Sequence, residues 1–95
     1  MKTFQVEILT PQKIVFSGTA EELVLRGALG YFGILAGHAP LIARLAPGKL
    51  KLTKDGKESV YQAGPGFAQV SPPATGVALR AGKERVSILL DEIKL

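Results

Sequence analysis

The segment Thr3-Phe4-Gln5-Val6-Glu7-Ile8 alternates polar and apolar side chains along the chain. In an extended strand, successive side chains point to opposite faces, so this alternation produces one apolar face and one polar face. Such a segment is typical of a β-strand that buries one face against a core. Similar short alternating segments recur along the rest of the chain, and a helical period is nearly absent. The pattern therefore predicts an all-β protein.

Turn residues separate these segments at short intervals. The clearest hairpin surrounds Asp55-Gly56, because this dipeptide tolerates the positive φ angles of a type I′ turn. Besides residues 3–8, strands are expected at residues 14–16, 23–25, 41–45, 49–53, 58–63, 67–70, 76–81 and 85–90. Strands with this spacing predict a sandwich or barrel of about nine or ten short strands.

Length and composition limit the protein to one domain with a modest core. The chain has 95 residues and no cysteine, which excludes disulfide bridges and thiolate metal sites. No secretion signal precedes the first strand, and no apolar run approaches the roughly 18 residues of a membrane span. We expect a monomer that meets a membrane only through a partner.

The charge of the chain gives only weak evidence about its partners. A formal net charge of +4 is mildly favourable for an anionic surface. The densest basic cluster alternates with leucines and surrounds the Asp55-Gly56 turn, as expected for the solvated face of a hairpin; its members are Lys49, Lys51, Lys54 and Lys57. No aromatic residue interleaves with these lysines, so nucleic acid is not an expected partner.

The inventory of reactive groups argues against an enzyme. His38 is the only histidine, and its neighbours Gly37 and Ala39 supply no carboxylate to orient it as a base. A turn histidine or a partner-contact histidine explains it better. Gly27, Gly30 and Gly33 do not match the spacing of a nucleotide-binding loop. No catalytic, metal or cofactor site is predicted.

The run Gly30-Tyr31-Phe32-Gly33-Ile34-Leu35-Ala36-Gly37-His38-Ala39-Pro40-Leu41 is expected to form an apolar loop framed by tight bends at an edge of the sandwich. Core burial of its four large side chains is the simpler alternative. Tyr31 and Phe32 are adjacent, however, so in extended backbone they point to opposite faces. At least one of them is then expected to face a partner.

This run resembles the G-x-x-G-I-L-x-G-H-A-P-L loop of the epsilon subunits of F-type ATP synthases. Three further segments resemble that family in the same order: Phe16-Ser17-Gly18, Leu45-Ala46-Pro47-Gly48 and Gly64-Pro65-Gly66-Phe67-Ala68-Gln69-Val70. The resemblance covers residues 3–71 well. It implies a flattened antiparallel β-sandwich in one domain over residues 1–95, and a non-catalytic rotor subunit at the cytoplasmic face of a bacterial cell membrane.

The resemblance also implies two partners, the gamma subunit and the ring of c subunits. Positions expected to meet gamma are Thr10, His38 and Ala43, and those expected to meet the c ring are Gly30, Tyr31 and Phe32. Tyr31 stands where the family frequently has Glu, so a contact through a carboxylate is replaced here by stacking or hydrogen bonding of a phenol. Ala36 replaces the usual proline.

The C-terminal third departs from the family pattern. Residues 72–84 are expected to be an insertion that forms an extra turn and strand, and Arg85-Val86-Ser87-Ile88-Leu89-Leu90-Asp91 resembles the family's last sandwich strand. The family's helical hairpin would have to follow, and the chain as given ends at Leu95. We therefore expect neither an inhibitory helical arm nor an ATP site.

Two other functions compete with the rotor subunit. A free-standing β-sandwich adaptor for an acidic protein would explain the basic charge but not the ordered family segments. A small enzyme would depend on His38, and activity lost on His38→Ala would favour it.

Overall fold

The computed structural model describes residues 2–71 and 85–94, which form ten β-strands. Their alternating sequences give alternating burial, as in β1, where Phe4, Val6 and Ile8 are buried and Gln5 is exposed. The strands are β1 (Phe4–Leu9), β2 (Ile14–Ala20), β3 (Glu22–Gly27), β4 (Gly30–Leu35), β5 (Leu41–Leu45), β6 (Gly48–Lys54), β7 (Lys57–Ala63), β8 (Gly66–Ser71), β9 (Arg85–Leu90) and β10 (Ile93–Lys94).

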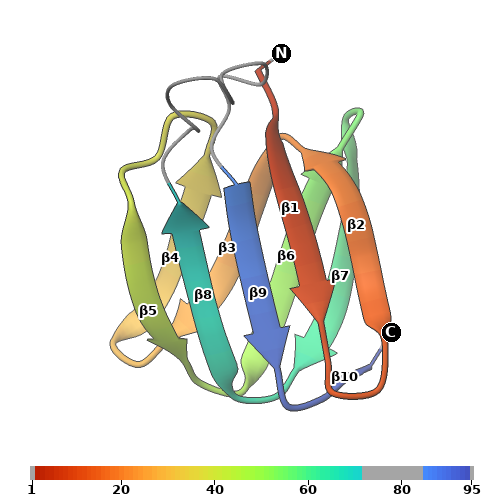
Figure 1. Ribbon diagram of the computed structural model, residues 1–95, viewed down its shortest axis with the longest axis vertical. Helices are drawn as coiled ribbons and strands as arrows, with labels where there is room; N and C mark the ends of the chain where they lie inside the picture. Colours follow the sequence, from red (N-terminus) through yellow and green to blue (C-terminus); the bar gives the residue numbers. More distant parts are fainter. Residues whose placement is uncertain (1, 72–84, 95) are drawn as a thin grey trace, which may run out of the picture.

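One strongly curled sheet contains all ten strands, in the order β10-β7-β6-β3-β5-β8-β9-β1-β2, with β4 paired to β3. The sheet folds over on itself, so that a front layer of β5, β8, β9, β1 and β2 faces a back layer of β4, β3, β6, β7 and β10 (Figure 1). The layers are joined where Gly27 of β3 pairs with Leu45 of β5.

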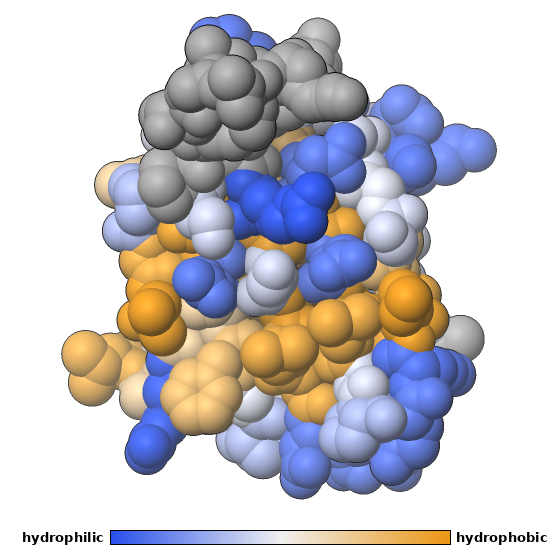
Figure 2. Space-filling model, viewed as in Figure 1, coloured by the Kyte–Doolittle hydropathy of each residue, from blue (hydrophilic) through white to orange (hydrophobic). Residues whose placement is uncertain are grey.

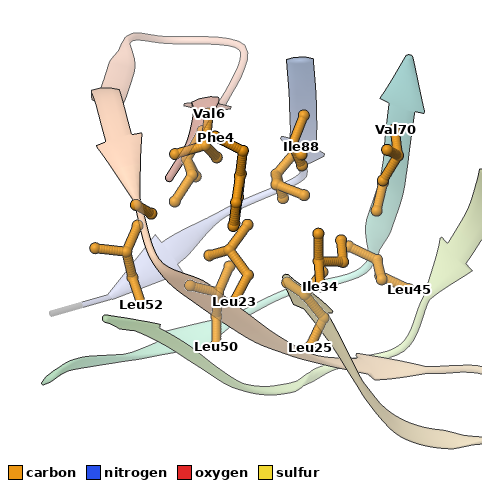
Figure 3. Close-up of a cluster of buried hydrophobic side chains, with 14 of the residues drawn as sticks. Phe4, Val6, Leu23, Leu25, Ile34, Leu45, Leu50, Leu52, Val70 and Ile88 are labelled. Carbon is orange, nitrogen blue, oxygen red and sulfur yellow. The ribbon is translucent and has the colours of Figure 1, made fainter. Parts of the chain in front are cut away.

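The core lies between the two layers. Phe4, Val6 and Ile88 of the front layer face Leu23 and Leu50 of the back layer, and all five are at most 2% exposed (Figure 3). Full burial of each such side chain contributes roughly 1.5 to 3 kcal/mol relative to its exposed state. The inward halves of the alternating segments thus form one continuous core.

The structure confirms the all-β, sandwich-like fold and refines it in one respect. Every strand pair is antiparallel among the described residues except β1 and β9, which run parallel. Parallel neighbours need a long connection. Because β1 and β9 lie near opposite ends of the chain, the strands between them supply that connection.

The run from residue 30 to residue 41 was expected to be a loop, but only part of it is one. Residues Gly30–Leu35 form β4, which pairs with β3 along its whole length, and only the remainder of the run is irregular. The glycines permit this close pairing: a Cβ at Gly27 would lie 3.0 Å from Cε1 of Phe32. The expected insertion, including the strand at residues 76–81, lies outside the described residues.

Residues 2–71 and 85–94 contain strands and turns but no helix. Accordingly, no helix in these parts of the chain is long and apolar enough to cross a membrane.

The β6–β7 hairpin gives a direct test of the fold. Asp55 and Gly56 have φ angles of 54° and 77°, as the sequence analysis expected for this turn, and the Gly56 N–H donates to Oε1 of Glu21 at 3.3 Å. We predict that Gly56→Val lowers the free energy of unfolding by roughly 1 to 2 kcal/mol, because a β-branched side chain is costly at positive φ. Gly56→Asn is the control and should lose much less, since Asn tolerates this conformation. Equal melting temperatures for Gly56→Val and the unsubstituted protein would contradict the assignment.

Candidate functional site

The outer surface of the front layer carries an apolar row. The register aligns Phe67 of β8 with Leu89 of β9, Leu89 with Leu9 of β1, and Leu9 with Ile14 of β2. Ile14 is 63% exposed, Phe67 51% and Leu89 50%. Figure 2 shows hydrophobic residues across the lower part of this face and polar residues above them. Four aligned apolar residues on a solvent face indicate an interaction surface.

A groove of about 720 Å³ follows part of this row. Phe67, Leu89 and Leu9 line it together with Thr10, and Arg44 and Asp91 add charge at its walls. Thr10 is positioned by the β1–β2 turn, in which its N–H donates to the Lys13 carbonyl at 2.9 Å. One residue expected to contact gamma therefore lines this groove.

A second hollow, of about 360 Å³, lies at the β3–β4 turn and β5, and we call it the edge hollow. It brings together Gly30, Tyr31, Phe32 and Ala43, three of which were expected to meet the c ring and one gamma. Phe32 is half-buried and packs against the core, whereas Tyr31 is 52% exposed. Adjacent residues thus point to opposite faces, as expected from the sequence, and Tyr31 is the one that faces solvent.

Arg44 lines both the groove and the edge hollow, so these two hollows adjoin along β5. His38 lies apart from them, in the loop between β4 and β5, at the opposite end of the molecule from the β1–β2 turn that holds Thr10 (Figure 1). The three residues expected to contact gamma therefore do not form one cluster. Ala43 and His38 lie on the β5 side of the molecule, whereas Thr10 lies in the turn between β1 and β2.

His38 has a local structural role. Its N–H donates to the Leu35 carbonyl at 3.0 Å, and its Nδ1 lies 2.7 Å from the Ala39 carbonyl oxygen. Since a carbonyl only accepts, Nδ1 carries the proton in this contact. In the described residues, no group of three or more histidine, aspartate or glutamate side chains could hold a metal ion.

Tyr31 has the one clearly perturbed electrostatic environment among the described residues. Its hydroxyl accepts a hydrogen bond from the Lys49 N–H at 3.2 Å, and the Arg26 guanidinium lies 5.5 Å from the centre of its ring. The Lys49 N–H is the main cause of a lowered pKa for the phenol, and Arg26 lowers this pKa further by hydrogen bonding and by its charge. The surroundings of Tyr31 therefore favour an anion.

The apolar row was not predicted from the sequence. The sequence did contain an indication of it. Phe67 and Leu89 alternate with the buried residues of their strands, so their side chains point to solvent; the buried residues are Ala68, Val70 and Ile88. What the sequence lacked was the register, since the alignment of Phe67 with Leu89 depends on pairing between distant segments.

Residues 3–94 match the family model of the ATP synthase delta/epsilon chain β-sandwich domain. The ATP synthase epsilon chain of Chromohalobacter salexigens is 42% identical over 78 residues, covering 81% of this chain and 55% of the relative. That of Ruminococcus albus is 37% identical over 84 residues, covering 88% and 63%. The chain therefore spans little more than half the length of these relatives. In Chlorobaculum tepidum the epsilon chain is 44% identical over 71 residues, and the match covers 74% of this chain and 81% of that relative.

Solved structures show the same fold. A chain of the mitochondrial ATP synthase of Euglena gracilis superposes with a TM-score of 0.79 at 25% identity, covering 96% of this chain and 52% of the other. A chain from the central stalk and c ring of the Tetrahymena thermophila enzyme superposes with a TM-score of 0.70. At 13% identity, this second likeness concerns the fold alone.

We predict that Tyr31 titrates below the ordinary pKa of tyrosine. Absorbance titration in a Tyr61→Phe background isolates it, because the chain has two tyrosines. Arg26→Ala should raise the pKa toward the ordinary value, while the distant Lys57→Ala should not. The lowered pKa adds stability that is complete above the pKa of the unfolded chain and is lost as the pH falls through the folded pKa. A midpoint at or above the ordinary value would refute the environment described for Tyr31.

Proposed function

The chain belongs to the family of ATP synthase delta/epsilon chain β-sandwich domains, and on that premise we propose that it is an epsilon subunit of the central stalk. In this role it binds the gamma subunit and the c ring, and it catalyses no reaction itself. The complex holds it at the membrane, at the cytoplasmic face in a bacterium. The family match over residues 3–94 is the observation that supports this proposal most strongly.

The gamma subunit is proposed to cover the apolar row and the adjoining groove. Exposed Phe67 and Leu89 form the centre of this surface, and Thr10 lies in the same groove. Removing such side chains from water drives association, and large apolar residues at the centre of an interface commonly dominate its affinity. Ala43 and His38 extend the contact along the β5 side.

The c ring is proposed to meet the β3–β4 turn and the edge hollow. Leu29 at the tip of this turn is fully exposed, and Gly30, Tyr31 and Phe32 follow it directly. With gamma on the front layer and the ring at this turn, one rigid domain would join the two. Close-packed cores resist deformation and transmit strain, which suits a subunit that passes torque between shaft and ring.

An adaptor for an acidic protein would leave the family match without an explanation, and it gains no support from the apolar row. Because family inhibition is attributed to the helical arm and not to the sandwich, we assign this domain a role in coupling and none in inhibition or ATP binding.

Reconstitution with the cognate complex lacking this subunit tests the proposal. ATP-driven ion pumping should rise relative to ATP hydrolysis, and hydrolysis itself should not be suppressed. Phe67→Asp should lose this effect and weaken assembly by roughly 2 kcal/mol or more, about thirtyfold, because the new charge must be desolvated in the interface.

The matched control for Phe67→Asp is Val60→Asp, an equally exposed position on the opposite layer, at 53% against 51%. It should assemble and couple normally. Both variants must keep the melting temperature of the unsubstituted protein. A strong fall in hydrolysis, or full assembly of a folded Phe67→Asp protein, would contradict the proposal.

A further inference from the structure

The outer surface of the back layer carries a second row at the same end of the molecule as the apolar row. Tyr31 of β4 pairs with Arg26 of β3, and Gln62 of β7 pairs with both Lys49 of β6 and Lys94 of β10. Arg26 and Lys49 both lie next to Tyr31, because the Arg26 guanidinium is 5.5 Å from the centre of its ring and the Lys49 N–H donates to its hydroxyl at 3.2 Å. We call Arg26, Lys49 and Lys94 the cationic row.

The cationic row has no acidic residue opposite its members in the sheet. All three side chains are exposed. The ion pair found in the described parts of the chain joins Lys51 to Glu58 at 3.5 Å, nearer to the turn of the β6–β7 hairpin, and includes no member of the row. The Arg26 guanidinium lies 5.5 Å from the centre of the exposed Tyr31 ring, so positive charge extends to the β4 end of this surface. Glu92 lines the same hollow as Gln62 and Lys94, so the β10 end of the row has an acidic neighbour, whereas Arg26 and Lys49 pair with uncharged residues. Unopposed cations on one surface attract an anionic partner.

The cationic row adjoins the edge hollow at its β4 end, because Tyr31, which lines the hollow, pairs with Arg26. Leu29 and Phe32 make the wall of that hollow apolar. An occupant must therefore place apolar atoms in the hollow and negative charges along the row beside it. A protein loop with carboxylates and apolar side chains meets both requirements, whereas a layer of lipid headgroups meets only the second.

We propose that the cationic row binds carboxylates on the loop of the membrane ring that contacts Gly30, Tyr31 and Phe32. This inference rests on the proposed function and specifies the chemistry of its ring partner. Where the family frequently has Glu, the phenol of Tyr31 lies over Arg26 and bonds to the Lys49 backbone. The sign of the contact is inverted: this chain supplies the cations and the ring supplies the acid.

A substitution at Tyr31 tests directly whether the ring loop that it contacts is acidic or basic. Binding of the 95-residue chain to its cognate complex lacking this subunit is measured at low and high KCl. Tyr31→Glu should weaken binding at low salt, whereas a basic ring loop would make the same variant bind more tightly. Tyr31→Gln introduces no charge, so it separates the effect of the added negative charge from the effect of losing the aromatic side chain.

Charge reversals test the row itself. Arg26→Glu and Lys49→Glu should each weaken binding by roughly three- to tenfold at low salt and much less at high salt, because exposed pairs are screened. Lys57→Glu, on an exposed lysine at the distant end of the β6–β7 hairpin, is the matched control and should bind like the unsubstituted chain.

The outcomes distinguish this inference from the proposed function. If the unsubstituted chain does not bind the complex, the proposed function fails. If it binds and Phe67→Asp weakens it while Arg26→Glu, Lys49→Glu and Tyr31→Glu do not, the function stands and the cationic row is refuted. Binding to vesicles containing phosphatidylglycerol that is lost in Arg26→Glu, without an effect on the complex, would assign the row to lipid and also overturn the inference.

Discussion

The burial of every second residue between two layers of one curled sheet is the constraint on which the rest of the molecule depends. Phe4, Val6 and Ile8 from the N-terminal strand and Val86 and Ile88 from the last long strand fill the same core. Because the inward-facing side chains of each strand are buried in this core, only the outward-facing side chains are available to bind partners. Binding surfaces on this fold are therefore rows of side chains that run across strands, and no enclosed chemical site is needed.

The two outer faces have specialised differently at the same end of the molecule. On the front layer, Phe67 and Leu89 belong to an apolar row whose association depends on desolvation. On the back layer, Arg26 and Lys49 belong to a cationic row whose proposed binding would depend on charge and on salt. The β3–β4 turn and the edge hollow lie between them, with Arg44 shared by the hollow and the front groove. This arrangement suits a small domain that fastens two different partners to each other.

Local patterns were enough to predict eight of the ten described strands, the Asp55-Gly56 turn and the sandwich, because alternation and turn chemistry depend on neighbouring residues. The short strand β10 was not predicted. The strand β4 was not predicted because Gly30 and Gly33 resemble bends, and only the pairing with β3 shows that residues 30–35 are extended. The parallel pairing of β1 with β9 and the alignment of Arg26 with Tyr31 depend on register between separate segments. For the same reason, the family resemblance could predict Tyr31 as a contact residue, but only the structure shows that Arg26 and Lys49 lie next to it.

The central claim, that the front layer is the surface buried in the rotor, is tested most directly by side-chain oxidation footprinting of this subunit alone and in its complex. Phe67, Leu89 and Ile14 should react with hydroxyl radicals in the free protein and become protected on assembly. Val60, which is 53% exposed on the back layer, should react equally in both states and serves as the internal standard. Unchanged reactivity of Phe67 and Leu89 together with protection of Val60 would contradict the account.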